Sequence, residues 1–368
     1  MKLSLPLQSQ RQPNPNRLNL RLALCPHPPG VRQLRFNQLE ISLANPRDWK
    51  RPIAYGVLPP YDEALRYLMG DSAALKKEAE DLRAVISKEE EAPDRDENAL
   101  KQKREKLNVL EVQSEINLPE VRWKVANGMA DMTRPVHRHL VEKKWREEGG
   151  LDLLMERLHQ MHVVPDILGS LRPSLDLHFV IRGNPTPVEP GVYLIPKQTR
   201  RPPRLYATVF HTDTRLYTLL MVDPDVPDEL NQIYQTYVHW LKPNIPLSAL
   251  SSSWIPDLDT HTPYVPPHPQ RGTIYHRYTT LLLPQQSPTD EISVPILSKE
   301  DRYGFNVRAF VEQYGLDGSR GGGAHMFREV WDPVVSRIYK DVLELDEPKF
   351  GRPRKENPFV GRGKRYVL

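Results

Sequence analysis

The spacing of hydrophobic residues changes along the chain and divides it into a helical part and a strand-rich part. From Asp62 to Ile116 the residues are mainly Ala, Leu, Glu, Lys and Arg, and leucines recur at helical spacing. The acidic stretch Glu89–Asp94 interrupts this pattern, Pro93 ends the first helix, and Asp96 is suited to cap the second. The pattern therefore predicts an αα-hairpin with charged outer faces.

Residues 117–162 continue as shorter helices, with apolar faces from residues such as Met129, Trp145 and Leu158 and a break at Gly149-Gly150. This region also contains four histidines. Cys and Asp partners are lacking at metal-binding spacings, so we predict solvated or helix-capping histidines and no metal site. The four are His137, His139, His159 and His162.

From Val164 onwards short apolar runs alternate with Pro- and Gly-containing loops, which predicts an antiparallel β-sandwich. Helices return near Val307–Tyr314 and Met326–Leu345, so the fold class is α+β. The expected strands are Leu175–Ile181, Tyr193–Ile195, Leu205–His211, Leu216–Val222, Tyr234–Leu241 and His276–Leu283. The whole chain divides into a leader (1–35), an extended arm (36–61), a helical extension (62–163), the sandwich (164–345) and a tail (346–368).

The arm has no clear period but contains three aromatic residues, Trp49, Tyr55 and Tyr61. Aromatic side chains in an irregular segment often anchor it to a partner. Packing against the protein's own surface is the alternative, and the sequence does not choose between the two.

The basic residues are concentrated at the two ends of the chain. Residues 1–35 contain six Lys or Arg and no acid, the composition of a mitochondrial targeting segment. The last 23 residues hold seven basic and three acidic residues and are expected to form an extended tail that contacts RNA phosphates. The candidate contacts are Lys349, Arg352, Arg354, Lys355, Arg362, Lys364 and Arg365.

Ionisable residues recur at the ends of the predicted strands. Asp223 and Asp225 flank Pro224 after the apolar run 219–222, and the Asp-Pro-Asp sequence is expected to end that strand in a turn. Two carboxylates at one rim can hold a histidine protonated, and His239 and His276 lie on strands that could face them. Such a pair can present N–H donors to an anion. No Ser, Cys or Lys forms a recognisable nucleophile motif beside them, so we expect no catalytic residue, no cofactor and no metal.

The order of these motifs resembles the phosphatidylethanolamine-binding protein family. The motifs are Val164-Pro165-Asp166, Asp223-Pro224-Asp225, His239-Trp240-Leu241, Gly272-Thr273 with His276-Arg277-Tyr278, Phe305-Asn306-Val307-Arg308, Tyr314-Gly315-Leu316, and Glu329-Val330-Trp331-Asp332 leading to Tyr339 in a closing helix. The resemblance implies a β-sandwich with peripheral helices. It also implies an anion pocket lined by Asp223, Asp225, His239, His276, Tyr278 and Tyr339.

Two places depart from that family's pattern. Ile274-Tyr275 stand where the family has a second glycine before the histidine, and the other departure is more important. His268 stands where the family has a glycine whose backbone approaches the anion. A side chain at this position can fill the pocket, so we expect a vestigial site that needs no small-molecule ligand.

The regions outside the sandwich resemble those of mitochondrial large-subunit ribosomal proteins built on this fold, in their fungal-like form. This resemblance implies a non-catalytic protein of the mitochondrial matrix that binds ribosomal RNA and neighbouring proteins in the central protuberance, without a membrane. The alternatives are a soluble phospholipid- or phosphopeptide-binding protein, with a protease inhibitor as one form, and a hydrolase that uses His239 and His276.

Overall fold

The computed structural model describes residues 43, 45–91, 96–184 and 186–351. All of them belong to one of the two units into which the chain divides, residues 41–368. The expected targeting segment at residues 1–35 lies outside the described residues. None of the described helices combines the length and the hydropathy needed to span a lipid bilayer.

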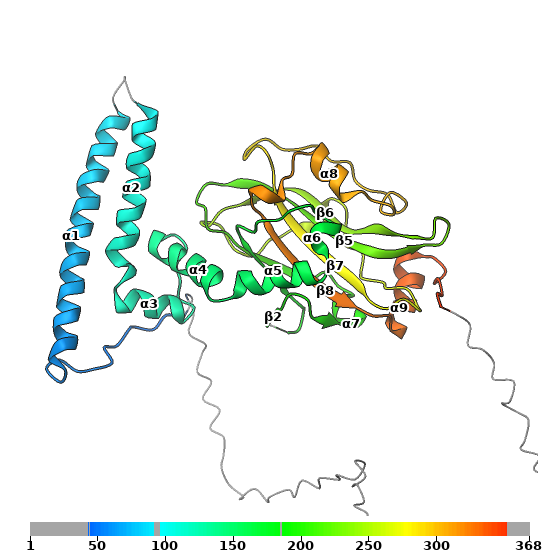
Figure 1. Cartoon of the computed structure of the whole chain (residues 1–368), viewed down its shortest axis with the longest axis horizontal. Coiled ribbons are helices and arrows are strands. Elements are labelled where there is room, and N and C mark those ends of the chain that lie inside the picture. The colour runs from blue at the N-terminus through cyan, green and yellow to red at the C-terminus, as the bar shows by residue number, and fades with distance from the viewer. Residues whose placement is uncertain (1–42, 44, 92–95, 185, 352–368) are drawn as a thin grey trace, which may run out of the picture. The chain divides into compact units, whose positions relative to one another are not determined.

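The helical hairpin is formed by α1 (Pro59–Glu90) and α2 (Glu97–Ile116), which lie side by side (Figure 1). The Asp96 side chain accepts hydrogen bonds from the backbone N–H groups of Asn98 and Ala99, which confirms its predicted capping role. Helix α1 begins three residues before the predicted start, because prolines are favourable in the first turn of a helix.

Small and apolar side chains form the contact between α1 and α2, and ion pairs lie at its margins. The buried residues include Ala79, Ile86, Leu100 and Leu110. Charged pairs such as Lys106–Glu78, with Nζ and Oε1 3.0 Å apart, join the two helices on the exposed side. Exposed pairs of this kind contribute only about 0–1 kcal/mol each, so the apolar seam holds the hairpin together.

Four further helices lead to the sandwich: α3 (Pro119–Ala126), α4 (Pro135–Glu147), α5 (Gly150–Gln160) and α6 (Val163–Asp166). Gly149 separates α4 from α5 with a φ of +94°, a left-handed conformation that favours glycine. The predicted break at Gly149-Gly150 is therefore confirmed. Trp145 near the end of α4 packs against Phe210, with ring centroids 5.7 Å apart.

Residues 45–58 of the predicted arm (36–61) contain no helix or strand element, and residues 59–61 belong to α1. Two of the arm's three aromatic residues contact Arg51, which is itself in the arm. Its guanidinium carbon lies 5.6 Å from the ring centroid of Tyr55 and 5.0 Å from that of Tyr61. Tyr55 is nevertheless 75% exposed, so these contacts do not decide between a partner and the protein's own surface.

Two sheets form the sandwich. The larger has the strand order β3-β8-β7-β5-β6 and the smaller the order β2-β1-β4, and all pairings are antiparallel except that of β3 with β8. The strands are β1 (Asp176–Val180), β2 (Pro187–Val188), β3 (Tyr193–Leu194), β4 (Arg204–Thr208), β5 (Arg215–Asp228), β6 (Ile233–Leu247), β7 (His276–Pro284) and β8 (Gly323–Glu329).

Short helices complete this part of the chain. They are α7 (Pro196–Thr199), α8 (Val307–Gln313) and α9 (Pro333–Ile338), with 3-10 turns at Leu258–Thr260 and Gly318–Arg320 and a π-helical turn at Tyr339–Leu343.

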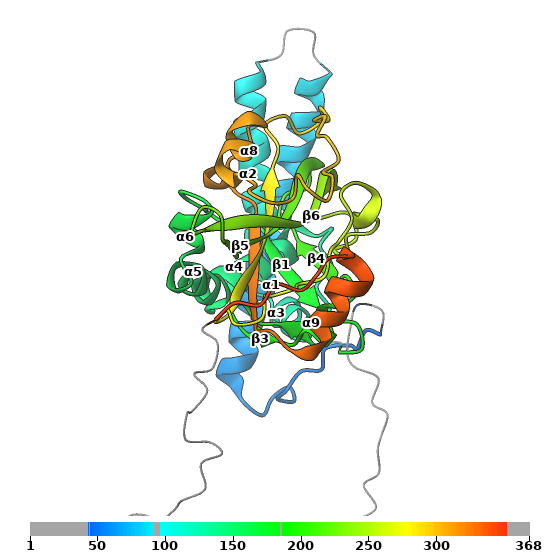
Figure 2. The same cartoon turned by 90° about the vertical axis from the view of Figure 1, so that its right-hand side faces the viewer.

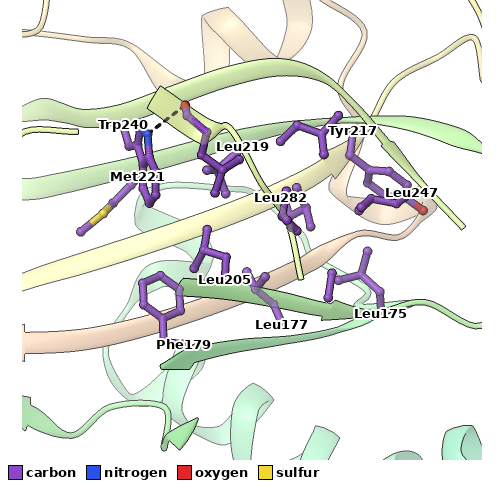
Figure 3. Packing of buried hydrophobic residues seen from close by; sticks show 14 of the residues in the cluster. Leu175, Leu177, Phe179, Leu205, Tyr217, Leu219, Met221, Trp240, Leu247 and Leu282 are labelled. Atoms are coloured by element: carbon purple, nitrogen blue, oxygen red, sulfur yellow. Dashed lines mark hydrogen bonds between the residues drawn. The ribbon is translucent and has the colours of Figure 1, made fainter. Parts of the chain in front are cut away.

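The larger sheet is covered on both faces. Leucines of β1 and β4 face leucines of β5 and β7 in the core between the sheets (Figure 3). Leu154 and Leu158 of α5, Val163 of α6 and Phe310 of α8 cover the opposite face. Figure 2 shows this order, with α5 and α6 on one side of β5 and β1 and β4 on the other. The expected β-sandwich with peripheral helices is therefore confirmed.

Two details of the predicted strands are wrong. Strand β5 does not end at Asp223 but continues to Asp228, and the Asp-Pro-Asp sequence produces an irregularity in the pairing with β6 between Asp223 and Val226. Pro224 lacks an N–H for the ladder, so the strand is distorted there without being ended. Met326, which the sequence placed at the start of a helix, lies in β8, because a short buried apolar run does not distinguish strand from helix.

Arg277 on β7 holds the segment before the sandwich against the sheet. Its guanidinium donates to Asp225 through Nε (2.8 Å) and the second terminal nitrogen (2.7 Å). The remaining terminal nitrogen donates to the carbonyl of Met161 (2.7 Å) and to Asp166 (3.2 Å). One partly buried side chain thus joins β5, β7 and the α5–α6 connection.

We expect Arg277→Met to lower the free energy of unfolding by about 2–4 kcal/mol, because it leaves Asp225 without its cation in a partly buried site. The measurement is urea denaturation followed by circular dichroism. Arg66→Met, which breaks an exposed pair within α1, is the control and should change stability by less than about 0.5 kcal/mol. Equal effects of the two substitutions would show that the network at Arg277 does not hold this segment.

Candidate functional site

Three adjacent strands bring the predicted pocket residues together. Strand β5 lies between β6 and β7, and it places Asp223 next to His276 of β7, with Oδ2 and Nδ1 2.6 Å apart. His239 comes from β6 and Tyr278 from β7. All four side chains are buried.

Asp223 and His276 form a buried ion pair. Burial by itself would lower the pKa of His276, but the charge of Asp223 and the hydrogen bond to it raise that pKa above its ordinary value. Burial by itself would raise the pKa of Asp223, but the charge of His276 and the hydrogen bond to it lower that pKa below its ordinary value. The other oxygen of Asp223 accepts the backbone N–H of Asp225 at 2.9 Å, and Thr273 Oγ lies 3.0 Å from His276 Nε2. The expected carboxylate–histidine pair is therefore present, with every polar atom of its two side chains engaged.

Asp225 takes a different partner from the one that its spacing suggested. Its carboxylate binds the guanidinium and the backbone N–H of Arg277 and so belongs to the network that anchors Met161 and Asp166. The backbone irregularity after Asp223 separates the directions of the two carboxylates. Only Asp223 bonds a histidine of the cluster.

The other two histidines are neutral. His239 Nδ1 lies 2.8 Å from the carbonyl oxygen of Val265 and His268 Nδ1 lies 2.9 Å from that of Pro266, so each Nδ1 carries the proton that is donated. Burial is the largest cause that lowers the pKa of His239 to about 3 and that of His268 to about 4. Neither ring supplies a positive charge for an anion at neutral pH.

His268 occupies the space between the other aromatic rings of the site. Its ring centroid lies 5.0 Å from Tyr237, 5.0 Å from His239 and 5.4 Å from Tyr339. Tyr237 also contacts His239 and Tyr303 edge to face. The side chain of His268 is therefore packed on several sides within an aromatic cluster.

Two polar atoms in this cluster have no hydrogen-bond partner among the described residues. They are Nε2 of His239 and Nε2 of His268. Unpaired buried polar groups cost free energy, so their presence at one place marks a site that is not built for stability alone. No Ser, Cys or Lys side chain hydrogen-bonds His239, His268 or His276 among the described residues, and no group of three potential metal ligands occurs there.

Three residues that shape the site were not among the predicted pocket residues. Tyr237 precedes His239 by two positions on β6 and therefore shares its face of the sheet, which is a signal that could have been used. Arg302 is buried and donates to the carbonyls of Val238, His239 and Pro263, at distances of 2.9–3.2 Å. The third residue is Glu329.

Glu329 is fully buried at the end of β8, opposite His276 in the strand register. Burial raises its pKa to about 8, and a side-chain hydrogen bond with the nearby Thr199 offsets this shift only in part. The side chain is therefore protonated at neutral pH and adds no negative charge to the site.

The candidate RNA-contact residues of the tail fall almost entirely beyond the described part of the chain. Lys349 is described and exposed, and it lies beside Arg271 in an isolated bridge. Arg352, Arg354, Lys355, Arg362, Lys364 and Arg365 lie outside the described residues.

A model of the phosphatidylethanolamine-binding protein family matches residues 185–321 of the chain. These residues contain all the expected pocket residues except Tyr339. The large ribosomal subunit protein mL38 of Schizosaccharomyces pombe is 34% identical over 225 residues, which are 61% of this chain and 71% of the yeast protein. The chain belongs to the mL38 family. In this family member the phosphatidylethanolamine-binding fold follows a helical region at residues 59–166.

Two solved structures are similar to the sandwich of this mL38 family member. The carboxypeptidase Y inhibitor in complex with its cognate proteinase is 18% identical, with a TM-score of 0.38, and the match covers 48% of this chain and 95% of the inhibitor. The phosphatidylethanolamine-binding protein of Plasmodium vivax is 19% identical, with a TM-score of 0.37, and the match covers 48% of this chain and 97% of that protein.

The buried neutral histidines make stability depend on pH. The pKa of His268 is about 4 in the folded chain, against about 6.5 for an unperturbed histidine, so the unfolded state binds protons first and stability falls as the pH drops through this window. We expect His268→Gln to reduce the loss of unfolding free energy between pH 7 and pH 5 by about 2 kcal/mol. Urea denaturation at both pH values measures it. His139→Gln, at an exposed position on α4, is the control, and an unchanged pH dependence in His268→Gln would contradict the assignment.

The buried carboxyl of Glu329 has the opposite effect. Its pKa is about 8 in the folded chain and near 4.5 when unfolded, so stability falls as the pH rises between these values. The ionisation of this group should lower the free energy of unfolding by about 2 kcal/mol between pH 6 and pH 7.5, and Glu329→Gln should remove that decrease. Thermal unfolding at the two pH values tests the expectation, with the exposed Glu312→Gln as control. A wild-type loss that persists in Glu329→Gln would mean that Glu329 ionises normally in the folded chain.

Proposed function

We propose that this chain is a structural, non-catalytic constituent of the mitochondrial large ribosomal subunit, located in the central protuberance and acting in the mitochondrial matrix. The observation that carries the proposal is the 34% identity to the yeast large-subunit protein over 71% of that protein's length. The match is longer than the 137 residues of the binding-family model, so it extends beyond that part of the sandwich.

The geometry of the pocket supports a scaffold over a ligand-binding protein. His268 is packed among Tyr237, His239 and Tyr339, and it lies where the binding family has a glycine. The charged pair Asp223–His276 has all its polar atoms engaged within the protein. An anion would have to displace these contacts, so we assign the pocket residues to a vestigial site.

The parts outside the sandwich provide the surfaces that a particle component needs. The hairpin exposes large apolar side chains that include Tyr67 and Met69 on α1 and Val109 on α2. Exposed apolar groups of this kind on a helical extension are suited to protein neighbours. We assign protein contacts to residues 62–163, ribosomal RNA contacts to the basic tail from residue 346, and targeting to residues 1–35.

A soluble phospholipid- or phosphopeptide-binding protein is the second candidate, and one observation favours it. The unpaired Nε2 atoms of His239 and His268 are polar groups that a bound molecule could satisfy. Such a protein would stay free in the matrix and would not need the helical extension.

Sucrose-gradient fractionation of a mitochondrial lysate that contains the tagged full-length chain tests the proposal. The chain should co-sediment with the large subunit. Deletion of residues 349–368 should weaken this association more strongly as salt increases, because each RNA-contacting cation displaces counterions from phosphates.

His268→Gly serves as the matched control, because it opens the pocket without touching the helical extension or the tail. It should enter particles as the wild type does. Recovery of the wild-type chain only in the light fractions would contradict the proposal and favour the soluble binding protein. Sedimentation of the truncated chain that is unchanged at every salt concentration would contradict the role of the tail.

A further inference from the structure

The smaller sheet has one face in the core and one face open to solvent. Along β1 and β4 buried and partly exposed residues alternate, and Leu177, Phe179, Leu205 and Ala207 point into the core between the sheets. The intervening residues therefore lie on the outer face.

Three aromatic residues form a row across this outer face. His178 of β1 pairs with Tyr206 of β4, and Tyr206 pairs with Trp254 in the segment that runs along the other edge of β4. The backbone of that segment is bonded to β4 on both sides of the pair, through Ala207 N–H to Ser253 O (2.7 Å) and Ile255 N–H to Leu205 O (3.0 Å). Ile255 enters the core and Trp254 is 48% exposed, so Trp254 lies on the same outer face as its two partners.

Arg204 supplies a cation on this face, and four further basic residues are close to it in the sequence. Residues 182–204 contain five basic residues and one acid, and all five basic residues are exposed. Arg204 precedes Tyr206 by two positions and therefore shares its face of the sheet. Val180, the last residue of β1, pairs with Arg204, and Arg182 follows Val180 by two positions. Arg200 has one distant ion pair, with Asp341 at 3.7 Å. The other basic residues, Arg182, Lys197, Arg201 and Arg204, have no ion pair among the described residues.

We propose that the outer face of the smaller sheet, with the row His178–Tyr206–Trp254 and the flanking arginines, binds single-stranded RNA. Bases stack on the aromatic side chains and the arginines contact the adjacent phosphates, which is the arrangement by which sheet surfaces hold single strands. This inference rests on the proposed ribosomal function and adds a second RNA contact, built on folded strands and separate from the tail.

The charges favour RNA over a protein partner. A protein-binding face would gain little from an exposed cation such as Arg204 that has no ion pair among the described residues, whereas a phosphate backbone supplies the missing charge. The acid on this face, Asp176, is held by His178, with Oδ2 and Nε2 2.9 Å apart. It therefore presents less repulsion to a phosphate than a free carboxylate would.

The first test uses the full-length chain and a fluorescein-labelled 12-nucleotide oligouridylate, with binding followed by anisotropy over a range of KCl concentrations. Tyr206→Val and Trp254→Val should each raise the Kd about five- to a hundredfold, because each removes a stacking surface. Arg204→Gln should lower the slope of log K against log salt by about one charge.

Matched controls come from other surfaces of the same chain. Tyr234→Val removes an exposed aromatic residue from β6, and Arg320→Gln removes an exposed cation from the Gly318–Arg320 turn. Neither should change the Kd. Thermal unfolding identifies any variant that fails to fold. If Tyr206→Val fails to fold, Arg204→Gln still decides the test, because Arg204 is exposed. Equal Kd values for Trp254→Val, Arg204→Gln and the controls would overturn the inference.

The second test locates the contact in the particle. Ultraviolet crosslinking of large-subunit particles, followed by peptide mass spectrometry, should yield nucleotide adducts on the peptides that contain Tyr206 or Trp254. If the chain is in the particle but these peptides carry no nucleotide, or are crosslinked to a protein instead, the inference is wrong and the proposed function stands. If the chain is absent from particles, the proposed function fails, and the oligonucleotide titration alone decides the inference.

Discussion

Strand β5 is covered on both faces, and this constraint determines the chemistry of the site. The smaller sheet lies against one face and α5, α6 and α8 lie against the other, so a polar side chain on β5 must find its partner inside the protein. Asp223 finds His276 and Asp225 finds Arg277. The first pair creates the only carboxylate–histidine contact of the described cluster, and the second fastens the α5–α6 connection to the sheet.

The same constraint explains why a site that resembles an anion pocket lacks the charge of one. His239 and His268 are buried without carboxylate partners, so they stay neutral, and Glu329 is buried without a cation, so it stays protonated. Asp223 raises the pKa of His276, and its carboxylate balances the charge that the protonated ring carries. The interior of the site therefore has a net charge near zero. Its unpaired polar atoms cost free energy, which the packing of the surrounding core offsets.

The surfaces of the chain are correspondingly different from its interior. The hairpin exposes apolar side chains between charged ones, and the outer face of the smaller sheet carries partly exposed aromatic residues beside the exposed Arg204. The first composition suits protein neighbours and the second suits RNA, and a component of a ribonucleoprotein particle requires both.

Much of this organisation was determined by the sequence, because it depends on local patterns. Helical spacing indicated the hairpin, Asp96 marked the start of its second helix, and the order of Asp223, His239, His276 and Tyr278 indicated both the fold and the pocket. Such residues indicate the strand or helix in which they lie from the local sequence alone, without any contact to residues far away in the chain.

Only the tertiary structure decided which groups meet and which stay charged. Asp225 was indistinguishable from Asp223 in the sequence, and a local irregularity in β5 sends it to Arg277 instead of a histidine. The sequence predicted that Glu329 belongs to a closing helix, but it lies on β8, where strand pairing places it opposite His276. His178, Tyr206 and Trp254 are distant in the chain, and only the strand register places them in one row. The reason is physical: pairing register and burial depend on contacts between residues far apart in sequence, and these contacts set both pKa values and surfaces.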